Sequence, residues 1–112
     1  MAKCTPKLLT QGAHFSIAIC TFCQRMGFHY NNLVAGFKKE DFIGFAKEIL
    51  ATSFHPFAQP FPPDGGLKTI VKTCHEDIQW AFDEDEFAEL QDLLQQTVLM
   101  LEAEEILNPD PS

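Results

Sequence analysis

The cysteine pair of this chain has the residue types and the spacing that can hold a metal ion. Cys20 and Cys23 form a Cys-x-x-Cys motif, and two thiolates at that spacing can bind one zinc ion, as they do in zinc-ribbon knuckles. A full zinc ribbon contains two such motifs, whereas this chain contains one. The motif therefore predicts a single zinc site that takes its remaining ligands from elsewhere in the chain.

The expected strand registers select those remaining ligands. A turn at residues 10–12 would bring Cys4 beside Cys20, and a second turn at residues 24–25 would place His29 opposite Cys20. A slip in either register would separate these side chains. The ligand set predicted in this way is Cys4, Cys20, Cys23 and His29.

The cysteines also allow other interpretations. Cys74 is the substitute ligand, because it aligns with His29 in an internal repeat. Without a metal, all four cysteines would be small apolar residues that bind nothing. Thiol redox chemistry is a further alternative, but it needs a stabilised thiolate, usually at a helix N-terminus. No cysteine lies at a predicted helix start, and Arg25 is the only cation near the motif.

The sequence motifs of common enzymes are missing. The chain contains neither a glycine-rich phosphate loop nor a His-Glu-x-x-His metal motif. His75, Glu76 and Asp77 form a polar cluster, but we expect such residues at a hairpin tip to be solvated. We therefore predict a protein that is not an enzyme.

The charges of the chain are unevenly distributed. The chain has 112 residues and a net charge of −8, and twelve of its sixteen acidic residues lie in residues 73–112, which contain no Lys or Arg. An acidic surface repels phosphate backbones, which argues against nucleic acid as the main partner. The acidic half is either a solvated helix face or a contact surface for a basic partner.

Apolar runs and targeting signals bear on where the protein is located. No apolar run approaches the roughly 18 residues that span a bilayer, so we expect no membrane segment. The first residues lack the apolar core and the cleavage site of a signal peptide. We expect a cytoplasmic protein whose cysteines are thiols or metal ligands rather than disulfides.

Periodicity indicates the elements that position these residues. A helical spacing of apolar residues predicts helices at residues 39–53 and 83–107. Asp83 and Glu86 have the spacing of a capping box at the start of the second helix. Alternating apolar residues predict strands at residues 7–9, 14–20, 28–37, 67–74 and 78–82.

Two stretches interrupt the regular pattern. Asn31 and Asn32 lie inside the third predicted strand and indicate a bulge or a local bend. Residues 55–66 contain four prolines and a glycine pair, which forbid helix and regular strand. They form either an ordered connector, in which Phe57 and Phe61 enter the core, or an extended segment for a partner.

The two halves of the chain agree at an offset of 45 residues. Phe37 aligns with Phe82, and Phe42 aligns with Phe87, where each predicted strand passes into a helix. This agreement predicts a repeated hairpin-and-helix unit. The simplest packing is an α+β fold, an antiparallel β-sheet with two helices packed on one face. We expect a single domain over residues 1–112, with unit one at 7–54, a Pro-rich connector at 55–66 and unit two at 67–107.

The last predicted helix carries more apolar residues than one contact can cover. A second apolar line on this helix consists of Leu93, Met100 and Leu107. Either the other helix covers this line, or the line forms the seam of a homodimer. We therefore predict a protein that acts through protein contacts and associates with itself, with zinc binding and thiol redox chemistry as alternatives.

A set of motifs resembles a family of small uncharacterised bacterial proteins. The order is Cys-x-x-Cys, then an aromatic residue with Asn-Asn-Leu, then Phe-x-x-x-Asp-Phe-x-x-Phe. The resemblance covers about a third of the chain and implies no activity and no catalytic residue. It also implies that members are shorter and lack the second unit. The matching residues are Cys20, Cys23, Tyr30, Asn31, Asn32, Leu33, Phe37, Asp41, Phe42 and Phe45.

Overall fold

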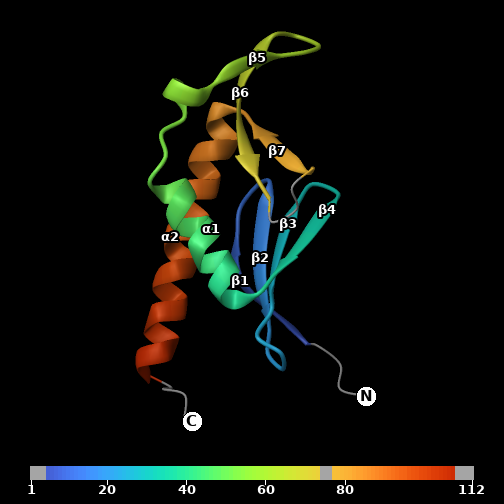
Figure 1. Cartoon of the computed structure of the whole chain (residues 1–112). Helices are drawn as coiled ribbons and strands as arrows, with labels where there is room; N and C mark the ends of the chain where they lie inside the picture. Colours follow the sequence, from blue (N-terminus) through green and yellow to red (C-terminus); the bar gives the residue numbers. More distant parts are fainter. Residues whose placement is uncertain (1–4, 74–76, 108–112) are drawn as a thin grey trace.

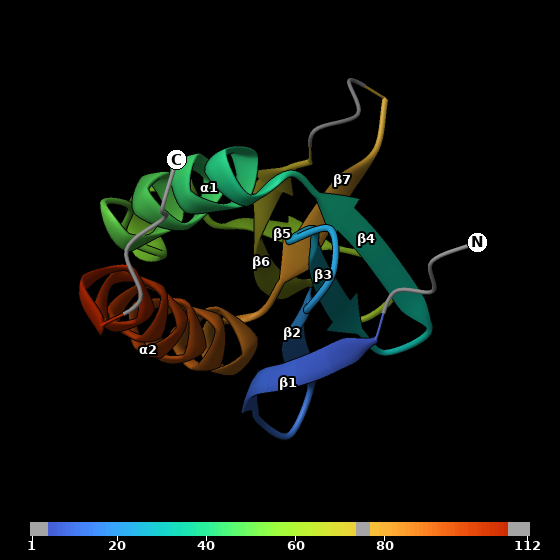
Figure 2. The same ribbon diagram turned by 90° about the horizontal axis from the view of Figure 1, so that it is seen from below.

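The chain folds into two antiparallel sheets and two long helices. The structure is a computed structural model that describes residues 5–73 and 77–107. Figures 1 and 2 show the two helices side by side, with the strands on one side of the helix pair. The expected α+β class is confirmed, although the strands form two sheets rather than one. Four residues with predicted roles lie outside the described residues: Cys4, Cys74, His75 and Glu76.

The first sheet has four strands, which lie side by side in the order of the sequence. Alternate residues of its central strands are buried, because the apolar residues recur at every second position. Ile17 and Phe28 pair across the centre of this sheet, and both are fully buried. The strands are β1 (Pro6–Gln11), β2 (Phe15–Cys20), β3 (Met26–Tyr30) and β4 (Leu33–Phe37).

A two-residue turn separates β3 from β4, where the sequence predicted one bent strand. Asn31 has a φ of 53°, and Tyr30 pairs with Leu33 across the turn. Tight hairpin turns need a positive φ, which Asn tolerates better than most residues. The expected bulge was wrong, because the chain reverses direction at residues 31–32. The sequence does not reveal this turn, since apolar residues continue on both sides of it.

The second sheet includes part of the Pro-rich connector. The prediction that this connector excludes a strand was wrong, because Pro60 pairs with Leu67 on an edge strand, where proline is tolerated. Phe57 is 64% exposed, so the expectation that it enters the core was wrong. The elements here are a short 3-10 helix, η1 (His55–Phe57), and the strands β5 (Gln59–Phe61), β6 (Gly66–Lys72) and β7 (Gln79–Phe82).

The two long helices are α1 (Lys39–Leu50) and α2 (Glu84–Leu107). The expected capping box of α2 is confirmed: the Glu86 N–H donates to Asp83 Oδ1 at 2.8 Å, and the Asp83 N–H donates to Glu86 Oε1 at 3.0 Å. These bonds satisfy backbone donors that the start of a helix otherwise leaves unpaired. Neither helix is long and apolar enough to cross a membrane, as judged over the described residues.

One aromatic core joins the two sheets. The Phe28 ring of β3 lies 5.0 Å from the Trp80 ring of β7, and the Phe15 ring of β2 lies 5.3 Å from Phe82. Ring pairs at such distances contribute about 0.5–1.5 kcal/mol beyond the area that they bury. Phe37 and Phe82 belong to the same buried cluster, so both halves of the chain share one interior.

Gln91 of α2 holds the end of α1. Its Nε2 donates hydrogen bonds to Ile49 O at 3.0 Å and to Thr52 O at 2.7 Å. The last carbonyl groups of a helix have no partner within that helix. The Gln91 side chain supplies donors to this end of α1 and so fixes its position along α2.

We expect Gln91→Ala to lower the free energy of unfolding by about 1–2 kcal/mol, because Thr52 O loses the Gln91 donor and Ile49 O keeps only its bond from the Thr52 N–H. Gln95→Ala is the matched control, since Gln95 is exposed on the same helix. The Gln95→Ala change should alter the free energy of unfolding by less than about 0.5 kcal/mol. Urea denaturation followed by circular dichroism measures both variants. Equal effects would show that the Gln91 bonds contribute nothing.

Candidate functional site

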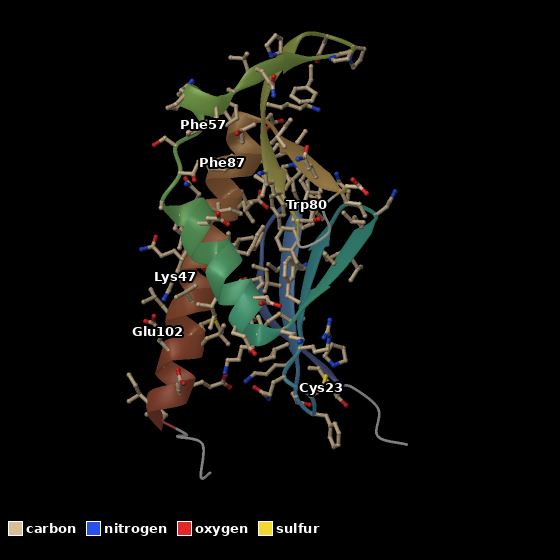
Figure 3. All side chains as sticks on the ribbon, viewed as in Figure 1. Cys23, Lys47, Phe57, Trp80, Phe87 and Glu102 are labelled. Carbon is tan, nitrogen blue, oxygen red and sulfur yellow. The ribbon has the colours of Figure 1, made fainter. Side chains whose placement is uncertain are left out.

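The loop between β2 and β3 turns back around the sulfur of Cys20. Cys20 ends β2 and is 8% exposed, whereas Cys23 is exposed in the loop at one end of the molecule (Figure 3). The Cys23 N–H donates a hydrogen bond to Cys20 Sγ at 3.4 Å. Gln24 has a φ of 63°, and its N–H donates to Cys20 O at 2.9 Å. An N–H donor aimed at sulfur stabilises a thiolate, because it hydrogen-bonds the charged form.

His29 does not lie opposite Cys20, so the register that placed it in the ligand set was wrong. His29 pairs with Ser16, and the His29 Nδ1 atom lies 3.4 Å from Ser16 Oγ. Ser16 and Cys20 are four positions apart on β2, which corresponds to about 13 Å. The β2–β3 turn is centred at residues 22–23 instead of 24–25, which shifts every partner on β3 by four positions.

The start of β1 lies beside this loop. The Thr21 N–H and the Thr21 hydroxyl both donate to Thr5 O, at 3.1 Å and 3.2 Å. The turn between β1 and β2 lies at residues 12–14, so the predicted turn at residues 10–12 was wrong by two positions. The β1–β2 pairing nevertheless brings Thr5 to the first residue of the cysteine loop.

The described part of the chain does not complete a metal site by itself. Among residues 5–73 and 77–107, no group of three or more His, Cys, Asp or Glu side chains could hold a metal ion. Two predicted ligands, Cys4 and Cys74, lie outside these residues. Figures 1 and 3 place Cys23 at the end of the molecule away from β6 and β7.

A second polar site joins α2 to the turn between β1 and β2. The His14 N–H donates to Glu89 Oε2 at 2.9 Å, and His14 Nδ1 lies 3.0 Å from Glu89 Oε1. A Cβ atom at Gly12 would lie 2.6 Å from Glu89 Oε2, so a larger residue there would displace the carboxylate. Sequence reasoning missed this pair, because its residues are 75 positions apart and belong to no local motif.

These contacts shift the titration of the groups involved. The hydrogen bond to Glu89 raises the pKa of His14, against a smaller effect of burial and with added attraction from Glu86 and Asp83. Burial raises the pKa of Glu89, but the hydrogen bonds from His14 outweigh it and leave that pKa below its ordinary value. Burial raises the pKa of Tyr30, as does the hydrogen bond that its hydroxyl donates to Glu86. These groups pair across elements, and the pairs fasten α2 to the first sheet.

The C-terminal part of α2 carries large apolar side chains on its solvent face. Four of them are between 41% and 80% exposed, and Figure 1 shows this part of α2 extending past α1. Of the predicted second apolar line, Leu93 is buried by the fold, whereas Met100 and Leu107 are exposed. Ala103 shares their face, because residues three and four apart are neighbours on a helix. The distal stripe consists of Leu99, Met100, Ala103, Ile106 and Leu107.

A cleft of about 380 Å³ lies between α1 and β6. Four consecutive residues of β6, 69–72, line this cleft together with Phe45 and Ile49 of α1 and Phe87 of α2. Successive side chains of a strand point to opposite faces. Consecutive residues therefore line one space only where the edge of the strand faces it, so the cleft borders an edge of β6.

We expect His14→Ala to cost more stability at about pH 5.5 than at about pH 8.5. The folded protein raises the pKa of His14, so the contribution of His14 is complete below its unfolded pKa of about 6.5 and is lost as the pH rises through the folded value. Glu89 stays ionised at the lower pH, because its pKa is lowered. Thermal unfolding at both pH values measures the difference. His29→Ala is the control, since its ring contacts Ser16, and the same pH dependence in both variants would contradict the expectation.

Comparisons with known proteins give this chain a family but no activity. No curated protein matches the chain, and no solved structure matches it. One family model matches residues 1–110, which include the second unit that the resemblance implied members to lack, so that implication was wrong. The expected relation to an uncharacterised family is confirmed. Because the match covers nearly the whole chain, the protein belongs to DUF6686, a family of unknown function.

Proposed function

We propose that this protein is not an enzyme and acts as a homodimer that forms through the distal stripe. The observation that supports the proposal is the exposure of four large apolar side chains on one face of α2. Full burial of one such side chain contributes about 1.5–3 kcal/mol. Contiguous exposed apolar patches mark contact sites for this reason.

The spacing of the distal stripe supports a second copy of the chain as the partner. Leu99 and Met100 precede Ala103 by four and three positions, and Ile106 and Leu107 follow it by three and four. A two-fold axis at Ala103 would set Leu99 opposite Leu107 and Met100 opposite Ile106 in antiparallel helices. A two-fold interface uses the same surface of both copies, so it must be self-complementary in this way. The small Ala103 side chain at the centre allows the helices to approach closely.

The charges beside the distal stripe distinguish a second copy from a basic partner. α2 contains no Lys or Arg, and Figure 3 shows Glu102 on the outer side of this helix. Two copies would bring like charges near each other, and salt screens such repulsion. The dimer should therefore strengthen as the salt concentration rises, whereas a contact with a basic partner would weaken.

Zinc binding at the β2–β3 loop is the second candidate function. The bond from the Cys23 N–H to Cys20 Sγ favours it, because a metal ligand must be a thiolate. We propose Cys4 as the third thiolate, since it directly precedes Thr5, whose carbonyl oxygen accepts two hydrogen bonds from Thr21. A cytoplasmic location, which is also part of this proposal, would keep the three thiols reduced.

Thiol redox chemistry at the same motif has less support than zinc. A redox cysteine must be accessible to its substrate as well as stabilised as a thiolate. Cys20 is 8% exposed, which restricts the approach of a substrate to its sulfur. A bound metal ion needs no such open approach once it is coordinated.

We expect the mean mass of the wild-type protein to rise with concentration to about twice the mass of one chain. Ala103→Glu should keep the mass of a monomer, because it places two charges at the two-fold axis. Ala103 is exposed, so this change leaves the core intact. Gln79→Glu adds the same charge at an exposed position on β7, away from the distal stripe, and serves as the control. Analytical ultracentrifugation at low and high salt measures all three proteins.

Two results would overturn the proposed homodimer. The first is a wild-type protein that stays monomeric at every concentration. The second is a dimer that weakens as the salt concentration rises, which would indicate an interface of opposite charges.

Protein purified without a metal-affinity column should contain about one equivalent of zinc per chain. Cys23→Ser and Cys4→Ser should each lose the metal, because each removes one thiolate ligand. Cys74→Ser is the matched control and should retain it. Cobalt substitution gives a second readout, because thiolate-to-cobalt absorption scales with the number of bound sulfur atoms. Zinc below about a tenth of an equivalent, or equal loss in all three variants, would exclude the site.

A further inference from the structure

We propose that the cleft between α1 and β6 binds an extended peptide, which adds as a strand to the free edge of β6. This site goes beyond the proposed homodimer and does not depend on it. Phe87 in the cleft and Ala103 in the distal stripe are sixteen positions apart on α2, a separation of about 24 Å. Loss of one site should therefore leave the other intact.

Half of β6 has an edge that no described strand occupies. β5 pairs with the first part of β6, whereas residues 69–72 pair with β7 alone within the described chain. The Thr73 N–H donates to Ile78 O, and the backbone groups of an antiparallel pair point alternately toward and away from the partner strand. By this alternation, the N–H and C=O groups of Ile70 and Lys72 point away from β7. They offer two donors and two acceptors to an added strand.

The space beside this edge is lined by buried apolar side chains, with Glu48 and Thr52 also on its wall. Phe45 and Ile49 come from α1, and Phe87 comes from α2; all three line the cleft and are at least nine-tenths buried. Phe57 of η1 also lines it and is 64% exposed. A strand edge that faces an apolar cleft under a helix is the arrangement in which β-strand addition gains both backbone hydrogen bonds and side-chain pockets.

The charges around the edge indicate the composition of the peptide. Alternate side chains of an added strand would point to the two faces of the sheet. One set would enter the cleft, where Glu48 disfavours an acidic side chain and the buried rings favour an apolar one. The other set would lie beside Lys68 and Lys72, which share the outer face of β6 with Ile70 by alternation. The peptide that fits is extended and alternates apolar with acidic residues.

A second copy of β6 would be a poor occupant of this edge. Pairing of two β6 edges would bring Lys68 and Lys72 of both copies together, and like charges on paired strands destabilise a sheet. Exposed lysines on an edge strand are a common way to prevent such pairing. The same lysines attract an acidic chain.

The probe is a blocked hexapeptide of alternating Val and Glu, titrated into the full chain and followed by amide chemical shifts. We expect saturable binding with the largest shifts at residues 69–72. A peptide with the same side chains, N-methylated at the amides that face β6, should not bind, because it cannot donate to the edge. A Val-Lys hexapeptide should not bind either, because its charges repel the lysines of β6.

Charge reversal on β6 tests the same site from the side of the protein. Lys68→Glu combined with Lys72→Glu should change the preference from the Val-Glu to the Val-Lys peptide by about tenfold or more. Lys72 is exposed, so Lys72→Glu alone gives a second variant that leaves the interior unchanged. Circular dichroism checks that each variant is folded.

The outcomes separate this inference from the proposed homodimer. Ala103→Glu should bind the Val-Glu peptide as the wild type does, whether or not the wild type dimerises. No binding of that peptide, equal binding of its N-methylated form, or an unchanged preference after charge reversal would each overturn the inference.

Discussion

The fold depends on α2, because this helix packs against β1 of the first sheet and against β6 and β7 of the second. Leu90 and Leu94 of this helix are fully buried in the core that the two sheets share. Apolar packing is not directional, so by itself it would leave the helix free to slide along the first sheet. Polar contacts at four levels of the helix fix its position: Tyr30 with Glu86, His14 with Glu89, Thr10 with Thr97 and Lys7 with Glu104.

The contacts that hold α2 in the fold involve its inner face and leave its outer face available for binding. The contact from Lys7 to Glu104 lies near the C-terminal end of α2, so the inner face is held along most of its length. The distal stripe lies on the outer face of the same segment. An apolar surface on a fixed helix loses little conformational entropy when it binds. The free edge of β6 has the same property, because pairing with β7 already orders its backbone.

Local signals in the sequence predicted the parts of the fold that depend on neighbouring residues. The α+β class and the capping box of Asp83 and Glu86 follow from patterns within a few residues. The turn at Asn31 was missed, because a period of two continues on both of its sides. The strand in the Pro-rich connector was missed, because tolerance of Pro60 depends on its edge position, which only the tertiary structure defines.

The candidate sites were harder to predict, because they depend on distant residues. The pairing partner of His29 depends on where the β2–β3 loop is centred. A shift of that centre by two residues moves the partner of His29 by four positions along β2. The pair of His14 and Glu89 joins opposite ends of the chain. The exposure of Met100 could not be separated in the sequence from the burial of Leu93, since both belong to one apolar line.

Amide hydrogen exchange along α2, compared at low and high protein concentration, tests most directly whether this helix divides its surface between the fold and a second copy. We predict that exchange at residues 99–107 slows as the concentration rises, while the amides of Leu90 and Leu94 exchange at the same rate in both samples. Concentration-independent exchange at residues 99–107 would contradict this division of the helix.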